Sequence, residues 1–298
     1  MSVTTVDLRE AYDYCQAVTK REARNFYFAF ITLPRRRRRA IYAVYAFARL
    51  ADDIADGTAS DASKAEQLRT LRGDLQAAFD GDPRGPVFIA LVDAGREYGV
   101  EQALFAQLID GVEMDLTPRR YRTFDELRGY CYHVASVVGL ISIEIFGYRD
   151  PRARDAAIDL GLAMQLTNIM RDVREDADAG RVYLPIDELE RFGYSEADLT
   201  HRVVNDRFVE LMRFQAERAR GYFDSGSTLL DYLSPRSRAC PAVLHGLYSK
   251  LLDRMAERGF RVFSERTRLS SAEKLKLTAK LWAMSLIPRH RTWRRRSR

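Results

Sequence analysis

Apolar residues recur at intervals of three and four along most of the chain, which is the spacing of one face of an α-helix. Turn-forming residues such as Pro34 and Gly57 separate these stretches. We find no alternating strand pattern, no fixed repeat and no Pro/Gly/Ser-rich linker. The pattern therefore predicts an all-α fold in a single domain, residues 1–288, followed by a basic tail, 289–298. The predicted helices cover residues 40–56, 66–79, 101–116, 124–146, 153–176, 206–223, 241–264 and 271–286.

Two of these helices are apolar nearly all round, which is typical of buried helices. They cover residues 40–55 and 158–173, and each carries one narrow polar stripe at helical spacing. The first stripe consists of Tyr42, Tyr45, Arg49, Asp52 and Asp56. The second consists of Gln165, Asn168, Asp172 and Asp176. Each stripe thus ends in two aspartates that lie one turn apart.

Carboxylates on buried helices need a partner, because uncompensated burial of charge is very costly. Mg²⁺ fits this role, since it binds through one or two carboxylates together with substrate phosphates. Arg49 and Arg171 add the positive charge that a diphosphate needs. The stripes therefore predict a Mg²⁺-bridged diphosphate at the mouth of a central apolar cavity, where ionisation would leave a carbocation. A solvated acidic face is the alternative interpretation of each stripe.

Aromatic side chains could stabilise such a cation through their ring faces. The candidates are Phe26, Phe30, Tyr42, Tyr45 and Tyr130. Core packing is the simpler interpretation for at least half of them.

The net charge of +6 over 298 residues comes from two short segments. Residues 35–39 are five consecutive arginines, and the last ten residues hold six more. Removing these eleven charges leaves +6 − 11 = −5, so the body of the protein is mildly acidic. We expect the first segment to be a solvated helix start. The tail, with Trp282 and Trp293 nearby, would either contact an anionic membrane surface or be a solvated end.

Nucleic-acid binding through the arginines is a competing hypothesis, but no nucleic-acid motif accompanies them, so we expect no such partner. The three cysteines form no CxxC pair, which fits a reducing cytosol. The longest uncharged run, residues 129–143, is too short to span a membrane. We therefore expect a cytoplasmic protein, with peripheral contact at the inner face of the membrane as an open alternative.

Several segments resemble the head-to-head prenyl synthases, the family of squalene, presqualene diphosphate, dehydrosqualene and phytoene synthases. The resemblance extends from about Tyr14 to Lys276. The second aspartate segment, DVRED, differs from that of head-to-tail prenyltransferases, and no N-D-x-x-S-x-x-x-E pattern of terpene cyclases occurs. The segments that carry the resemblance are NFYFAFITLP (25–34), AIYAVYAFARLADDIAD (40–56), YCYHVASVVG (130–139), QLTNIMRDVREDADAGRVYLP (165–185) and ERGFRVFSER (257–266).

The resemblance implies an isoprenoid-synthase helical bundle and assigns roles to particular residues. Mg²⁺ would be bound by Asp52, Asp56, Asp172, Asp176 and Asn168. Diphosphate would be contacted by Tyr45, Arg49, Arg171, Tyr183, Tyr248 and Arg266. The prenyl channel would be lined by Phe26, Phe30 and Gln165. Tyr130 would steer the cation or its proton loss, and AGRVYLP would be a mobile flap.

The implied reaction is a prenyl transfer that joins two identical allylic diphosphates head to head. We predict farnesyl diphosphate as the substrate, with presqualene diphosphate or squalene as the product. NADPH would be needed only for squalene. Two features favour this C15 substrate, namely Ser136, where phytoene synthases usually have glycine, and the pair Phe26 and Phe30, which could floor a short channel. The alternatives are a phytoene synthase acting on geranylgeranyl diphosphate and a dehydrosqualene synthase.

Overall fold

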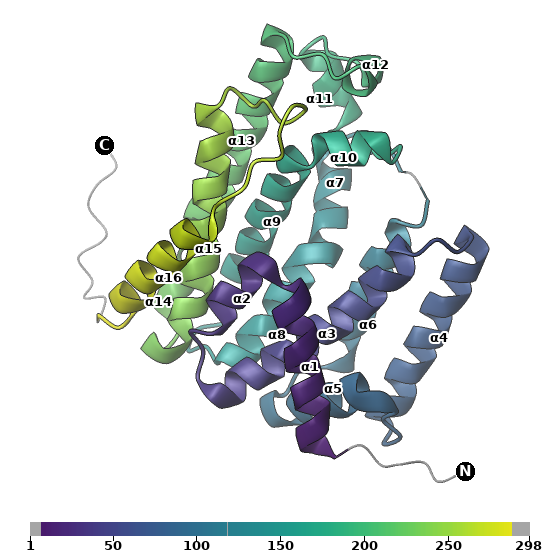
Figure 1. The fold of residues 1–298 in the computed structure, drawn as a ribbon, viewed down its shortest axis with the longest axis vertical. Helices are drawn as coiled ribbons and strands as arrows, with labels where there is room; N and C mark the ends of the chain where they lie inside the picture. The colour runs from purple at the N-terminus through teal and green to yellow at the C-terminus, as the bar shows by residue number, and fades with distance from the viewer. Residues whose placement is uncertain (1–6, 118, 288–298) are drawn as a thin grey trace.

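The computed structural model describes residues 7–117 and 119–287, which fold into sixteen α-helices and one π-helical turn. These residues contain no strand, only two isolated β-bridges, so the predicted all-α single domain is confirmed (Figure 1). The predicted tail, 289–298, lies outside the described residues. The helices of the first half are α1 (Leu8–Glu22), α2 (Arg24–Phe30), α3 (Arg35–Asp56), α4 (Asp61–Phe79), α5 (Gly85–Tyr98), α6 (Gln102–Met114), α7 (Phe124–Cys131), η1 (Tyr132–Ser136) and α8 (Val137–Phe146). Those of the second half are α9 (Ala153–Arg171), α10 (Val173–Asp178), α11 (Ile186–Arg191), α12 (Glu196–Thr200), α13 (Asp206–Gly226), α14 (Leu229–Tyr232), α15 (Pro235–Glu257) and α16 (Ser271–Ser285).

Helix α9 is the central element of the bundle and packs against α13, α8, η1, α15 and α7. Glycines allow its close approach to its neighbours. A Cβ atom on Gly226 of α13 would lie 2.7 Å from the backbone nitrogen of Leu160, and one on Gly161 would lie 2.8 Å from the Cα of Ser136. Because α9 is surrounded in this way, the polar residues at its end lie next to side chains from several other helices.

The segment 153–176 is not one continuous helix, contrary to the prediction. The backbone at Asp172 leaves the helical region, with φ −103° and ψ 13°, and α10 begins at the next residue. Asp172 is a poor helix former, and arginines at positions 171 and 266 hold its carboxylate. The break therefore places Asp172 between the two helices, whereas Asp176 lies on α10.

The predicted helix over 241–264 is also wrong at its end, because α15 stops at Glu257. Gly259 adopts φ 62° and Phe260 adopts φ 54°, and this left-handed pair turns the chain. The expectation missed α1, α2 and α5 as well. In α5, Pro86 occupies one of the first helical positions, where no backbone N–H is needed, so the proline starts the helix instead of breaking it.

The five arginines at 35–39 begin α3, as predicted, but three of them are not simply solvated. Arg38 donates a hydrogen bond to the carbonyl oxygen of Ile31 at 3.2 Å. Arg37 donates a hydrogen bond to the Ser237 hydroxyl on α15, and the Arg39 guanidinium lies 4.0 Å from the ring centre of Tyr12 on α1. These contacts attach the start of α3 to its neighbours.

One stretch of helix in the described residues, Phe124–Phe146, is long and apolar enough to cross a membrane by length and composition. Half of its apolar window is buried inside the protein, and its η1 and α8 segments pack against α9. A core helix of a globular bundle has the same properties, which agrees with the prediction of a buried helix here.

Candidate active site

The last two turns of α3 carry Asp52 and Asp56. Both residues are exposed at the surface, but protein atoms crowd the Asp52 carboxylate and displace water from it. Burial raises the pKa of Asp52 to about 7; Arg49 opposes this shift, and the charges of Asp56 and Asp115 add to it. Arg49 itself forms its ion pair with Asp53. Carboxylates therefore outweigh cations at this end of α3.

Asp115 directly follows α6 and joins this acidic region from a third segment of the chain. The hydroxyls of Tyr130 and Tyr183 donate hydrogen bonds to its two carboxylate oxygens, at 3.0 and 2.9 Å. Burial raises the pKa of the Asp115 carboxyl, against the effect of these hydrogen bonds. The two tyrosine rings stack with their centres 5.2 Å apart, so Asp115 fixes both rings at once.

Asp115 was not among the predicted site residues. The signal for it in the sequence is weak: one acid after an apolar helix, just before the break at residues 117–118.

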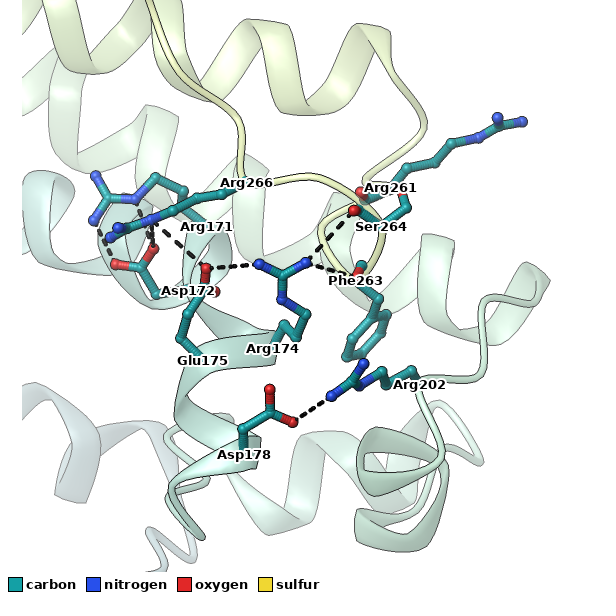
Figure 2. A network of polar contacts seen from close by, with 10 residues as sticks. All are labelled: Arg171, Asp172, Arg174, Glu175, Asp178, Arg202, Arg261, Phe263, Ser264 and Arg266. Atoms are coloured by element: carbon teal, nitrogen blue, oxygen red, sulfur yellow. Dashed lines mark hydrogen bonds and ion pairs between the residues drawn. The ribbon is translucent and has the colours of Figure 1, made fainter.

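At the second aspartate segment, Asp172 is held by two arginines (Figure 2). The Nε atoms of Arg171 and Arg266 each donate to the same carboxylate oxygen at 2.8 Å. Burial alone would raise the pKa of Asp172, but the hydrogen bonds and charges of the two arginines lower it below its usual value. Asp172 is thus an ion-pair partner in this structure, and its charge is already matched.

Asp176 lies one turn further, on α10, in a different environment. Burial raises its pKa to about 7; Arg181 opposes this, and Asp172 and Asp115 add to it. The Arg181 Nε lies 3.8 Å from the Asp176 carboxylate. Asp176 therefore belongs with Asp52, Asp56 and Asp115, with which it shares an excess of negative charge.

Helix α10 is attached to the loop that follows α15, as Figure 2 shows. Arg174 donates to the carbonyl oxygen of Phe263 at 3.2 Å, and Arg266 reaches Asp172 from the same loop. On the outer side, Asp178 pairs with Arg202 at 2.7 Å. The loop between α15 and α16 therefore positions the second aspartate segment.

The predicted flap, residues 179–185, connects α10 to α11. Gly180 takes φ 72°, and Val182 forms a β-bridge with Arg120. Arg181 projects from this segment, and its charge interacts with Asp176, Asp115 and Asp56. Its buried Nε has no hydrogen-bond partner. Arg181, which the sequence analysis did not single out, therefore places a positive charge from the predicted flap next to these carboxylates.

The predicted prenyl-channel residues lie close to these polar groups. The Phe26 ring centre is 6.0 Å from that of Phe30, 6.3 Å from Tyr45 and 6.1 Å from Tyr248. Tyr248 interacts in turn with Arg171 and Asn168. The phenylalanine pair therefore packs beside tyrosines that were predicted to contact the diphosphate.

Ser136, the other feature that favoured a C15 substrate, has a structural role. Its side chain is fully buried, and its hydroxyl donates to the carbonyl oxygen of Ile158 on α9 at 2.9 Å. This bond joins the π-helical turn η1 to the central helix. The Ser136 hydroxyl therefore holds two helical segments of the protein together.

The structure brings the predicted site residues into one region, in two adjoining groups. One group contains the carboxylates that face Arg181, together with Tyr130 and Tyr183. The other is formed around Asp172 by Arg171, Arg266, Tyr248 and Asn168. Tyr45 connects them, because it interacts with Arg49 and Asp52 on one side and with Tyr248 on the other. Gln165 adjoins the second group by accepting a hydrogen bond from Asn168 at 3.3 Å.

The oxygen ligands present in this region fit a Mg²⁺ ion that binds together with a substrate phosphate. Among the described residues, no three Asp, Glu, His or Cys side chains approach closely enough to enclose an ion by themselves. Asp52 and Asp176 nevertheless have raised pKa values beside further carboxylates, and the buried Oδ1 of Asn168 has no hydrogen-bond partner. Such a site needs cations and additional oxygen ligands, which a magnesium diphosphate would supply.

Comparison with known proteins gives a consistent result. The family model for squalene/phytoene synthases matches residues 19–273. The chain is 37% identical over 279 residues to a phytoene synthase of Arthrospira platensis, covering 89% of this chain and 90% of that protein. It is 38% identical over 283 residues to a phytoene synthase of Mycobacterium tuberculosis, covering 94% and 93%. A crystal structure of a dehydrosqualene synthase in complex with ligand superimposes with a TM-score of 0.85 at 29% identity, covering 93% of this chain and 97% of that one.

Proposed function

The chain belongs to the squalene/phytoene synthase family and is a prenyltransferase of the head-to-head type, and we propose that it is a phytoene synthase that condenses two molecules of geranylgeranyl diphosphate. The observation that carries this proposal is the identity of 37–38% to phytoene synthases over about nine tenths of the chain. These relatives favour the C20 alternative over the farnesyl diphosphate that the sequence analysis preferred.

We give the relatives more weight than the two C15 features of the sequence, because those residues also have contacts within the protein. Phe26 packs beside Tyr45 and Tyr248, Phe30 packs beside Tyr42 and Tyr45, and Ser136 bonds to the backbone of α9. The proposed reaction needs no NADPH.

We further propose that the cationic side chains of the site bind the diphosphate. Arg49 lies beside the first aspartates, and Arg171 and Arg266 lie beside the second. Arg171 and Arg266 are held ready by Asp172, and each has guanidinium N–H groups to spare for a phosphate oxygen. Mg²⁺, when bound with the substrate, would neutralise the leaving diphosphate and so assist ionisation.

The stacked pair Tyr130 and Tyr183 would act on the hydrocarbon part of the reaction. Asp115 holds both hydroxyls, which fixes the two ring faces next to the polar end of the site. A carbocation formed there would be stabilised by the ring quadrupoles. Phe26, Phe30 and Gln165 would contact the prenyl chains.

Product analysis tests the proposal directly. The purified protein is incubated with Mg²⁺ and either the C15 or the C20 diphosphate, with and without NADPH, and the extracted hydrocarbons are identified by mass spectrometry. We expect a C40 hydrocarbon from the C20 substrate without NADPH, and no product from the Asp52→Asn variant. Efficient conversion of the C15 substrate with none of the C20 substrate would contradict the proposal.

A further inference from the structure

Helix α16 has one face that is firmly attached to the protein. Its start is capped by Ser270 and Glu273, and Arg254 of α15 pairs with Glu273. Leu277 and Leu281 lie over Gly246 of α15, at a distance that leaves no room for a side chain there. The helix also packs against α2, which carries Phe26 and Phe30. Its orientation on the protein is therefore fixed.

The opposite face of α16 is apolar as well, and it is exposed. Leu275, Trp282 and Leu286 follow one another at intervals of seven and four, with exposed fractions of 59, 46 and 48%. Met284, nearer the attached face, and Ile287, just after the helix, are exposed as well, at 53 and 64%. Of the nine large apolar side chains exposed in the described residues, these five gather within 275–287. We call the row Leu275, Trp282 and Leu286 the α16 outer face.

The charge around the α16 outer face has a single sign. Lys276 and Lys280 are exposed on the flank of the helix next to this apolar row. Glu273 is the last acidic residue of the chain, and residues 274–298 contain only lysines and arginines as charged groups. A second copy of this basic surface would repel the first, whereas anionic lipid headgroups would attract it.

We propose that the α16 outer face docks the protein on an anionic lipid bilayer, with Trp282 and its apolar neighbours at the boundary between headgroups and acyl chains and the lysines on the headgroups. Tryptophan is favoured at this boundary because its ring is apolar and its N–H is polar. The basic tail, which the sequence analysis considered alone, adds long-range attraction. Docking goes beyond the proposed function and does not depend on it.

Trp282 is a built-in probe, because the chain has only two tryptophans. In the Trp293→Phe variant of the full chain, all tryptophan emission comes from Trp282. We expect this emission to shift to the blue on addition of phosphatidylglycerol vesicles, and to be quenched by lipids brominated on the acyl chain. Phosphatidylcholine vesicles should give a much weaker response. If the protein sediments with the vesicles but its tryptophan emission does not change, the proposal is overturned. Binding would then come from electrostatic attraction of the basic tail alone.

Sedimentation with the same vesicles tests the individual side chains. Leu286→Asp should weaken binding about tenfold or more, because it replaces an apolar side chain that would enter the bilayer with a charged one. Val204→Asp is the matched control, since Val204 has the same exposed fraction, 48%, far from α16 in sequence, and it should bind as the parent does. Lys276→Gln and Lys280→Gln should each weaken binding about fivefold. Equal binding by the Leu286→Asp and Val204→Asp variants would overturn the proposal.

Light scattering of the protein without vesicles tests whether this face binds a second copy of the chain instead of a membrane. We expect the same molar mass for the parent and for Leu286→Asp. Self-association of the parent that Leu286→Asp abolishes would overturn the proposal, because the face would then bind a second copy of the chain. Prenyl transfer assayed in detergent with Leu286→Asp should match that of the parent, so a loss of docking is distinguishable from a failure of the proposed function.

Discussion

Asp52 and Asp56 lie one turn apart on an unbroken helix, whereas Asp172, with the same spacing from Asp176 in the sequence, lies at a helix break and Asp176 lies on the helix that follows. In the first segment the carboxylates mainly face other carboxylates, and the pKa of Asp52 rises to about 7. In the second, Asp172 is paired with two arginines and its pKa falls. Equal spacing therefore does not imply equal electrostatics.

This difference suggests that the two segments attract groups of opposite charge. The first segment, together with Asp115 and Asp176, has a surplus of negative charge that favours cations. Around Asp172 the arginines already supply the positive charge, and their remaining N–H groups suit an anion. A metal-bound diphosphate carries both signs of charge, so it would fit between the two groups.

The largest expected effect is loss of turnover when a carboxylate of the unpaired group is removed. Asp52→Asn and Asp176→Asn should each lower kcat/KM by about 10²-fold or more, because each removes a carboxylate that would hold the Mg²⁺ needed to neutralise the leaving diphosphate. Steady-state assays at saturating Mg²⁺ measure this. Asp178→Asn is the control on the same helix as Asp176, since Asp178 pairs outward with Arg202. Similar losses in Asp178→Asn and Asp176→Asn would contradict the assignment.

Stability should respond in opposite directions at the two segments. Asp172→Asn leaves Arg171 and Arg266 without their shared carboxylate and should reduce the free energy of unfolding by about 2–3 kcal/mol. Asp52→Asn removes a carboxylate that burial and its neighbours disfavour, so the metal-free protein should become more stable. Urea unfolding in the presence of EDTA compares the two variants. Destabilisation by both to the same degree would remove this distinction between the segments.

The pH dependence of the metal-free protein follows from Asp52 and Asp176, whose pKa values rise from 3.8 to about 7. Between these values the folded state binds more protons than the unfolded chain, so stability should fall as the pH rises towards 7. Asp172, whose pKa is lowered, contributes constantly above pH 5. We expect a lower melting temperature at pH 8 than at pH 5.5 in EDTA, and a smaller difference in the Asp52→Asn/Asp176→Asn double variant. An unaltered difference in that variant would exclude these two carboxyls as its source.

The smallest effect is expected at Arg181, the cation that the flap places near Asp176, Asp115 and Asp56. Arg181→Ala should lower the melting temperature in EDTA by a few degrees at most, because the arginine is one third exposed. Mg²⁺ should reduce this deficit, since a bound cation replaces the lost charge. Arg202→Ala, which breaks only the outer pair with Asp178, should show no such recovery. Equal recovery in both variants would contradict a cationic role for Arg181.

The sequence was informative wherever a local pattern carried the structure. Apolar spacing located most of the long helices, and the polar stripes located the aspartate segments. It failed at helix ends and breaks. The left-handed pair at 259–260 and the turn at Asp172 depend on contacts with residues far away in the chain. The choice between the C15 and C20 substrates rested on Ser136 and Phe26, whose contacts depend on neighbours that only the fold brings to them, and the relatives favour the C20 alternative.

The sequence alone determined the all-α class, the two aspartate segments and the family, because helical periodicity and short motifs depend on residues close together in the chain. Only the tertiary structure decided which charges meet. Arg266 reaches Asp172 across 94 residues, and Asp115 joins Tyr130 and Tyr183 from a different helix. It also decided that Leu277 and Leu281 of α16 are covered while Leu275 and Trp282 are not. Periodicity shows that a helix has apolar faces, but only packing determines which face the protein itself covers.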